Sequence, residues 1–464
     1  MGPGRVSTSE AVCQAYVAVS GVPQPQNLKP DIVVLAETTE QVSEIVKAAN
    51  YFMVPVTPRG AIGAPVKGGI LLDLSLMDKI LTVDSVNMKA VAEAGCSFFK
   101  LNQELFKHGL MLPAAFYGPG PCVASSVILP AQGIGGARYG ANITLVEGFE
   151  VVLPSGEIVK VGSMAYFEKD FGPSYRYVWG PDLVGLFTKS NGAFGIVTKV
   201  AYRCVRRPKH WAFYSAYWPF ENLENSSKVV LEGVASEIFE VHWVDRWWLS
   251  RSHPGLPEEC QWVVTFAVNA NNERELEGKV QFVKELCDSY EGKYFPSLAE
   301  DLYTRWPTKL WDLGFIPMQG ALKTKRMRAQ ITGMLSGIHP ISRLPEFVAK
   351  VSELFKQHQL WSAERGPGFD GFPLNSMVMN NIVVYLIDPR DRDMAKRVVE
   401  CRAEFEEWFA KKGGVYQGRE MRGGLTEPTW MNQMEACKLL RIIKAALDPN
   451  NVLSPETFEL KRGC

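Results

Sequence analysis

The sequence lacks the common arrangements of metal-binding side chains. Its six histidines show no HxH, HExxH or HxxxH spacing, and its nine cysteines include no CxxC pair. These absences argue against a protein-bound catalytic metal and against an iron–sulfur cluster held by this chain alone. An odd number of scattered cysteines also fits reduced thiols better than a disulfide framework, so we expect a cytoplasmic protein.

Charge imbalance and long apolar runs are also missing. Lys plus Arg and Asp plus Glu both number 50, so no net charge would attract nucleic acid or anionic lipid. No apolar run reaches the length of a transmembrane helix, and the stretch from Met1 to Glu10 lacks the apolar segment of a signal peptide. We therefore expect a small-molecule substrate and no nucleic acid.

Glycine, by contrast, is concentrated between Gln132 and Arg207. Four glycines fall within residues 133–140, a hairpin pattern surrounds residues 154–156, and residues 190–195 form a second small-residue loop. Glycine lets the backbone approach a ligand closely, so two such loops flanking a β-scaffold indicate a site for an extended polar cofactor. Tight turns in a β-protein are the alternative interpretation.

A further loop follows the short strand predicted at residues 54–58. Its residues are Arg59, Gly60, Ala61, Ile62, Gly63 and Ala64. Consecutive backbone N–H groups in such a turn form a concavity that can bind a diphosphate. The loop matches neither GxGxxG nor a Walker sequence, and a plain turn is the alternative.

Hydrophobic periodicity predicts the remaining elements. Strands are expected at residues 31–35, 69–75, 90–95, 148–153, 157–161, 196–202, 211–220, 261–270 and 378–386. Helices are expected at residues 38–50, 97–109, 272–290, 343–357 and 391–412. At 464 residues the chain is long for one domain, and tryptophan becomes frequent after His210, so we expect two domains.

Taken in order, these motifs resemble the flavin-binding half of the vanillyl-alcohol oxidase and p-cresol methylhydroxylase superfamily. That superfamily includes the FAD subunit of glycolate oxidase and D-lactate dehydrogenases. The matching segments are PRGAIGAPVKGG (58–69), GIGGARYG (133–140), GPDLVGLFTKSN (180–191) and ALDPNNVLSP (446–455). The resemblance implies an α+β fold, with a two-part FAD-binding domain over residues 1–208, an α+β cap (substrate) domain over residues 209–412, and a segment, residues 413–464, that returns to the FAD-binding domain.

The resemblance also implies FAD as the cofactor and assigns residues to it. The backbone amides of Arg59 to Ala64 would hold the diphosphate. The isoalloxazine and ribityl chain would pass Ser125, Ser126, Gly133 and Gly135, and the adenine end would lie at Gly195, Ile196 and Val197. Relatives carry Gly and then Ser or Thr where this chain has Ala61 and Ile62, so one side-chain hydrogen bond to phosphate is lost.

The catalytic residues of the family are only partly present. The histidine runs HxGDGNxH and GEHG are replaced by GFDGFPLN (368–375) and GREMRGG (418–424), so a metal-assisted 2-hydroxy-acid site is not expected. Arg422 falls where the phenol-oxidising branch has a Tyr-Arg pair and could stabilise an oxyanion, or form an ion pair with Glu420 or Glu427. Tyr385 and Tyr416 could act as acid or base, or be structural.

Other side chains carry weaker expectations. A basic cluster in the cap could anchor an acid or a thioester, or be solvated surface; its members are Arg305, Lys323, Lys325, Arg326 and Arg328. Glu364, Arg365 and Asp370 surround a Gly/Pro turn that could line the pocket. Covalent flavin attachment through Cys122 is not expected, because the first loop has no histidine. The many tryptophans are core residues by default, but they also favour an aromatic or apolar substrate.

The sequence therefore predicts an FAD-dependent dehydrogenase that acts on an alcohol, a phenolic benzylic carbon or a hydroxy acid by hydride transfer to flavin N5. Because the chain shows no second redox centre, electrons would pass to a protein partner, in an oligomer or hetero-complex. The alternative is a flavin-binding subunit that relays electrons or serves as a scaffold in a larger redox complex.

Overall fold

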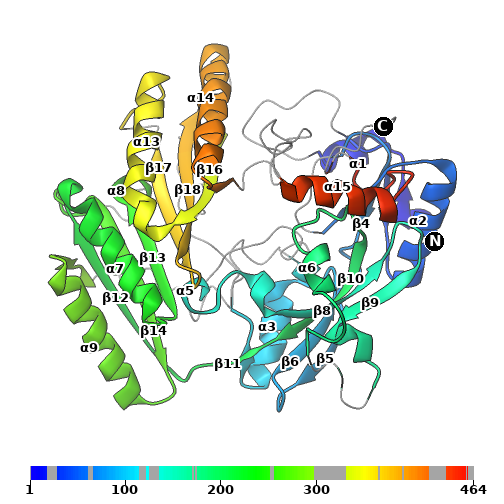
Figure 1. Cartoon of the computed structure of the whole chain (residues 1–464), viewed down its shortest axis with the longest axis horizontal. Coiled ribbons are helices and arrows are strands. Elements are labelled where there is room, and N and C mark those ends of the chain that lie inside the picture. The colour runs from blue at the N-terminus through cyan, green and yellow to red at the C-terminus, as the bar shows by residue number, and fades with distance from the viewer. Residues whose placement is uncertain are drawn as a thin grey trace.

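The protein combines helices and sheets in two parts that lie side by side (Figure 1). The computed structural model describes residues 2–17, 29–60, 66–113, 122–124, 135–169, 172, 175–250, 255–296, 331–363, 366–388, 391–416, 435–455 and 457. One part holds the N-terminal sheets and the last helix, and the other holds one large sheet with its helices. The expected α+β class is confirmed.

The first part begins with a four-stranded sheet in the order β1-β2-β4-β3. Its strands are β1 (Val6–Ser7), β2 (Ile32–Leu35), β4 (Ile70–Asp73) and β3 (Val56–Arg59). Strands β2, β4 and β3 are parallel, and helix α2 (Thr39–Phe52) connects β2 to β3. The Thr38 side chain caps α2 by accepting the Gln41 N–H. The three parallel strands therefore end at the same edge of the sheet.

A second, antiparallel sheet completes this part in the order β5-β6-β10-β8-β9. Its strands are β5 (Ile80–Asp84), β6 (Lys89–Glu93), β10 (Ile196–Arg203), β8 (Val146–Val152) and β9 (Ile158–Gly162). The smaller elements are α1 (Glu10–Ala15), α3 (Phe98–Lys107), α5 (Gly136–Tyr139), α6 (Leu183–Phe187) and the pair β7 (Leu110–Met111) with β11 (Val205–Arg206). One apolar core joins the two sheets with α2 and α3.

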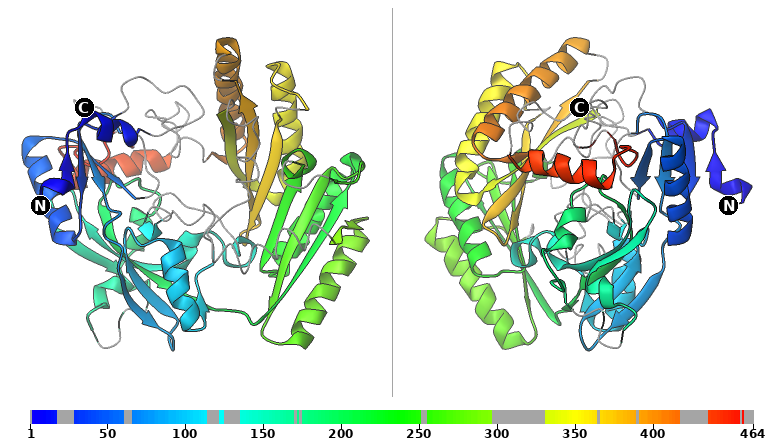
Figure 2. Two further views of the ribbon diagram at one scale, coloured as in Figure 1. Left: turned by 180° about the vertical axis from the view of Figure 1, so that it is seen from behind. Right: turned by 45° about the vertical axis from the view of Figure 1, so that its right-hand side comes forward.

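The second part is an eight-stranded sheet in the order β15-β12-β14-β13-β17-β18-β16-β19. The strands are β15 (Lys293–Tyr294), β12 (His210–Trp218), β14 (Trp262–Ala270), β13 (Glu240–Asp245), β17 (Gly368–Leu374), β18 (Val378–Ile387), β16 (Ile331–Pro340) and β19 (Val415–Tyr416). Helices α7 (Leu223–Ala235), α9 (Glu273–Ser289), α13 (Leu344–Gln357) and α14 (Arg392–Lys411) cover its outer face, and α8 (Arg246–Leu249) follows β13. The other face is turned toward the first part (Figure 2).

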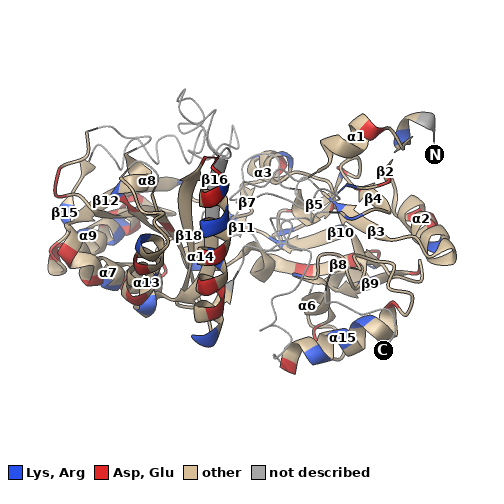
Figure 3. Ribbon diagram, turned by 90° about the horizontal axis from the view of Figure 1, so that it is seen from above, with Lys and Arg blue, Asp and Glu red and all other residues tan. Residues whose placement is uncertain are grey.

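The helices carry the charged side chains, whereas the sheets are mostly uncharged. Lys and Arg alternate with Asp and Glu along α7, α9, α13, α14 and the last helix, α15 (Glu435–Leu447) (Figure 3). Short 3-10 helices complete the described elements: Pro3–Arg5, Asn142–Leu145, Ser163–Tyr166, Phe220–Asn222 and Ile341–Arg343. The mixed charges agree with the balanced composition.

Helix α15 packs on the first part, where Leu440, Ile443 and Leu447 join its core. The chain therefore returns to this part, as the resemblance implied. The return comes later than the expected boundary at residue 412, because β19 still pairs with β16 in the cap sheet. Below, the first part is called the FAD-binding part and the second part the cap, after the domains that the resemblance implies.

Candidate active site

Three segments that are far apart in the sequence meet at the carboxyl end of the parallel strands. Strand β3 ends at Arg59, where the first glycine loop was predicted to begin. A Cβ added to Gly192 would lie 2.4 Å from Pro58, so the second glycine loop packs directly on β3. The Ser454 hydroxyl donates to Asn191 O at 2.7 Å and ties the C-terminal segment to the same loop. Ligands of parallel sheets bind at this end of the strands.

A buried lysine fixes this meeting point. Lys444 on α15 and Asp448 are both fully buried, and Lys444 Nζ lies 2.5 Å from Asp448 Oδ2. The same ammonium donates to Ala193 O at 2.9 Å and to Leu453 O at 2.6 Å. Burial lowers the pKa of Lys444, while Asp448 opposes that shift. Lys444 thus joins the last helix to the second glycine loop, and its partners Asp448 and Leu453 lie within the ALDPNNVLSP segment that carried part of the resemblance.

The side chain of Arg59 points to the N-terminal helix. Its Nη1 donates to Tyr16 O at 2.5 Å, and its guanidinium carbon lies 5.2 Å from the centroid of the Tyr16 ring. The Tyr16 hydroxyl donates to Asp73 Oδ2 at 2.6 Å, and burial together with Asp73 raises the pKa of Tyr16 to about 12. The Arg59 carbonyl accepts the Leu74 N–H at 2.9 Å, so the side chain and the carbonyl are both engaged where the predicted diphosphate loop begins.

Gly195, Ile196 and Val197 lie where the second loop enters β10. A Cβ at Gly195 would lie 2.5 Å from Val151 Cγ1, so only glycine allows the loop to pack on β8. Ile196 and Val197 are buried in the core and pair with β8. Pairing of β10 with β6 begins only at Lys199. The side chains of these residues therefore pack, and their predicted contact with adenine would involve the backbone.

Gly135 lies at the boundary between the two parts of the molecule. It precedes α5 with φ +89°, and its N–H donates to Glu240 Oε2 of the cap at 2.7 Å. Gly136 O accepts the Asn375 N–H at 3.2 Å. The glycine-rich segment predicted to line the isoalloxazine is thus attached to the cap sheet.

Several predicted residues lie outside the described residues. They are Ala61, Ile62, Gly63, Ala64, Ser125, Ser126, Gly133, Arg422, Glu364, Arg365 and the basic cluster from Arg305 to Arg328. Their assigned roles stay predictions.

The two predicted tyrosines do not lie together on the inner face of the cap. Tyr385 is 3% exposed in the core between the sheet and the outer helices, with its ring centroid 5.1 Å from that of Phe355 on α13. This placement favours the structural role that was its alternative. Tyr416 lies on β19, opposite Gly337 of β16.

The cap instead presents a histidine–aspartate pair on adjacent strands. His242 Nε2 of β13 lies 2.5 Å from Asp370 Oδ1 of β17, and the two side chains are 11% and 8% exposed. The His242 ring stacks on Phe372, with 4.7 Å between centroids and 20° between planes. The pairing of Trp243 with Gly371 sets this register. The imidazole is therefore held on one side by an aromatic ring and at one nitrogen by a carboxylate.

Strand alternation shows which face carries this pair. Successive side chains of a strand point to opposite faces, so Glu240 and His242 share a face and Trp243 takes the other. Trp243 packs in the core beneath the outer helices, whereas Glu240 contacts Gly135 of the FAD-binding part. His242 therefore lies on the face turned toward the FAD-binding part, two residues or about 7 Å along the strand from that contact.

The surroundings of the pair are aromatic and aliphatic. Phe372 forms a cluster with Ile382, Val384, Trp247 and Trp248. A Cβ at Gly368 would lie 2.0 Å from Trp247, so this glycine is what allows the indole to pack on β17. The His242–Asp370 pair thus lies beside an apolar cluster on the inner face of the cap, a combination found in small-molecule sites.

Asp370 was expected beside a Gly/Pro turn that could line the pocket, but its pairing with His242 was not predicted, because neither strand was. The residues between Arg365 and Asp370 were interpreted as a turn, since Gly and Pro are frequent there. Pro373 is tolerated in β17 because the pairing with β13 stops at Gly371 and α5 lies beyond it. The alternation of Glu240 and His242 with Val241 and Trp243 was the signal that could have revealed β13.

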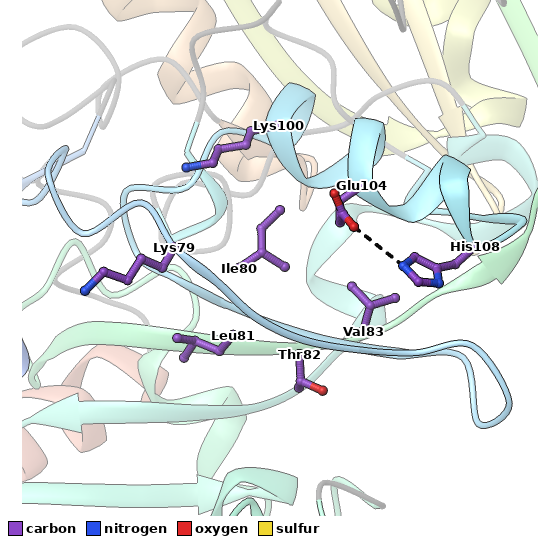
Figure 4. Close-up of a pocket in the computed structure, with 8 residues that line it drawn as sticks. All are labelled: Lys79, Ile80, Leu81, Thr82, Val83, Lys100, Glu104 and His108. Atoms are coloured by element: carbon purple, nitrogen blue, oxygen red, sulfur yellow. Dashed lines mark ion pairs between the residues drawn. The ribbon is translucent and has the colours of Figure 1, made fainter.

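A separate pocket of about 520 Å³ lies between β5 and α3 (Figure 4). Its lining residues are Lys79, Ile80, Leu81, Thr82, Val83, Lys100, Glu104 and His108. The charged side chains there pair with one another or with neighbours, as in Lys100 with Asp78 and His108 with Glu104. It includes no residue of the glycine loops or the cap, so we do not assign it to the active site.

Two kinds of feature are absent from the described part of the chain. There, no three side chains among His, Cys, Asp and Glu come together as a metal site. Among the same residues, no helix combines the length and apolar character needed to cross a membrane.

The residues present fit FAD. Gly192, with φ +76°, and Gly195 let the second loop pack against Pro58 and Val151, near the carboxyl end of parallel strands where a dinucleotide diphosphate binds. The Gly135 segment hydrogen-bonds to Glu240 of the cap, on the strand that carries His242.

The sequence matches two known protein families, each over a different part of the chain. The family described as FAD binding domain matches residues 30–162, and the family of FAD linked oxidases, C-terminal domain, matches residues 211–457. Glycolate oxidase subunit GlcD of Bacillus subtilis is 24% identical over 98% of this chain and 94% of that protein. D-lactate dehydrogenase [cytochrome], mitochondrial, of Arabidopsis thaliana is 23% identical over 92% of this chain and 73% of that protein.

The fold is that of a solved flavoenzyme. The crystal structure of p-cresol methylhydroxylase with substrate bound superposes with a TM-score of 0.83 at 18% identity, covering 99% of this chain and 94% of that one. The type of fold inferred from the sequence resemblance is thereby confirmed.

Proposed function

This chain belongs to the FAD-linked oxidases, and we propose that it is a dehydrogenase that oxidises an alcohol or a benzylic carbon of an aromatic or apolar substrate. Membership of the family makes it an oxidoreductase that uses FAD. The single observation that carries the finer proposal is the His242–Asp370 pair on the inner face of the cap.

The chemistry divides between the cofactor and the chain. FAD, when bound, would supply the hydride acceptor, N5 of its isoalloxazine. His242 takes the proton of the substrate hydroxyl, and Asp370 orients the ring and stabilises its charged form. Because Nε2 faces Asp370, its proton donates there, and Nδ1 is the nitrogen with the lone pair. A hydroxyl at Nδ1 can then lose its proton while the adjacent C–H bond breaks.

The lining of the site supports the substrate class. Phe372, Trp247 and Trp248 surround the pair, and they suit an aromatic or aliphatic body better than a small charged acid. A hydroxy acid is the second candidate, because two relatives are named for glycolate and lactate. It would need a cation, and Arg422 is the residue proposed for that role.

We also propose that electrons leave to a protein partner. One relative, D-lactate dehydrogenase, is named for a cytochrome, and this name supports the proposal. The competing proposal, a subunit that only relays electrons, predicts that no small molecule reduces the flavin directly.

Anaerobic mixing of the purified flavoprotein with a panel of aromatic alcohols, alkylphenols and hydroxy acids tests the function. We expect the flavin absorbance to bleach with an aromatic alcohol or alkylphenol, and the rate with an alcohol to fall by about 100-fold or more in His242→Gln. His108→Gln, at an exposed histidine outside the site, should match the unmodified protein. Unchanged bleaching by an alcohol in His242→Gln would show that His242 is not the base. If no compound of the panel bleaches the flavin, the electron-relaying subunit is favoured.

A further inference from the structure

A single carboxyl group connects the glycine-rich segment of the FAD-binding part to the cap. Glu240 is 2% exposed, and its Oε2 accepts the Gly135 N–H at 2.7 Å. The Gly136 N–H lies toward the same carboxyl and also favours its ionised form. Both donors therefore depend on one acceptor from the other part of the molecule.

The glycine segment cannot hold this conformation by itself. Helix α5 has four residues, far fewer than an isolated helix needs to be stable. Gly135 has φ +89°, and a Cβ there would lie 2.9 Å from Pro113 and 3.1 Å from Phe239. The segment is thus confined from outside, and the Glu240 hydrogen bonds set where its N–H groups point.

Glu240 is well placed to be a fixed anchor. It lies on β13, which is paired on both sides, with β14 through Ala267 and with β17 through Trp243. On the same strand and the same face, His242 follows two residues later. The distance between the glycine segment and His242 is therefore set by one rigid strand.

We propose that Glu240 is a positioning residue of the active site, which holds the Gly135–Gly136 turn at a fixed distance from His242. This inference rests on the proposed function, since it places the flavin ring beside that turn. Its consequence is that removal of the carboxyl should loosen cofactor and base together, although neither touches Glu240 in the geometry described.

The charge state of Glu240 provides a readout that a packing residue would lack. Burial raises the pKa of this carboxyl to about 8 from 4.5, against the two backbone hydrogen bonds, which lower it. The folded protein therefore binds one more proton than the unfolded chain between these values, so stability falls as pH rises from about 4.5 to about 8 and then levels off. Other titratable or charged side chains on the surrounding elements are His242 and Asp245 on β13, Arg138 and Tyr139 on α5, Asp370 on β17, and Glu224, Lys228 and Glu232 on α7; β14 has none.

Three variants test the proposal. Glu240→Gln keeps an acceptor for both N–H groups, so it should bind FAD as the unmodified protein does at pH 6. Its midpoint of thermal unfolding should rise relative to that protein by about 2–4 °C between pH 6 and pH 9. Glu240→Leu leaves two buried donors without an acceptor and should release FAD about 10- to 100-fold faster. Glu237→Gln, at an exposed acid near α5, should change neither quantity.

The outcomes separate this proposal from the proposed function. Release of FAD from Glu240→Leu at the unmodified rate would overturn the positioning role, whatever His242→Gln does to bleaching. If Glu240→Leu does not fold, the pH dependence of Glu240→Gln still decides: a constant difference in unfolding midpoint from pH 6 to pH 9 would contradict a neutral buried carboxyl at this contact. Faster FAD release from Glu240→Leu, together with normal bleaching in His242→Gln, would support the positioning role of Glu240 and exclude His242 as the base.

Discussion

The FAD-binding part and the cap build their halves of the site from different atoms. In the FAD-binding part the proposed site is made of backbone, at Gly60, Gly192 and Gly195, and the side chains nearby hold that backbone in place. In the cap it is made of side chains, His242 and Asp370, whose residues are 128 positions apart in the sequence. Backbone sites need glycine at fixed spacing, which leaves a motif in the sequence. Side-chain sites need only a strand register, which leaves almost none.

Removing the Lys444 ammonium, which joins the last helix to the second glycine loop, should have the largest effect. Lys444→Met leaves Asp448 buried without its partner, at a cost of about 3–5 kcal/mol. We expect the purified variant to lose FAD and to unfold well below the unmodified protein, measured by flavin absorbance and thermal denaturation. Lys438→Met, at an exposed lysine of the same helix, should do neither. A Lys444→Met protein that retains FAD would show that FAD binding at the second glycine loop does not depend on Lys444.

An intermediate effect is expected from the cap. Asp370→Asn should keep the fold and the flavin, because Asn still accepts from His242 Nε2, but it cannot stabilise the charged imidazole. We expect kcat/KM for an alcohol substrate to fall by about 100-fold. Asp391→Asn is the matched control, since Asp391 caps α14 on the outer side and Asn caps helices equally well. Equal activity of the two variants would mean that the His242–Asp370 pair is only structural.

The difference between the parts also explains what the sequence could and could not predict. Helix α2, the β8–β9 hairpin and helices α9, α13 and α14 follow from local periodicity, and each was predicted. Strand β17 was not predicted, because Gly368, Gly371 and Pro373 resemble a turn, and strand β13 was also missed. Without these strands, Tyr385 and Tyr416 were the candidates for acid–base chemistry, with a structural role as the alternative, and the side chain of Tyr385 lies on the far face of the sheet.

For the rest of the site, the resemblance predicted backbone positions but no side-chain contacts. It identified the glycine loops, but it could not say that Arg59 contacts Tyr16, a residue 43 positions earlier. Nor could it show that Glu240 connects the Gly135 turn to the cap, because that contact depends on the docking of two separate parts.

The smallest effect is expected at Arg59, and it sharpens the distinction between backbone and side chain. Its guanidinium is engaged by Tyr16, so Arg59→Met should change the dissociation constant for FAD by less than about threefold, the scale of a partly exposed interaction. Gly60→Val, one residue later, should instead strip the flavin, because a β-branched side chain blocks the approach of the backbone amides to the diphosphate. Titration of the two apoproteins with FAD, followed by flavin fluorescence, measures both. A tenfold or larger loss of affinity in Arg59→Met would mean that the guanidinium leaves Tyr16 and pairs with phosphate when the cofactor binds, and the first loop would then use a side chain as the cap does.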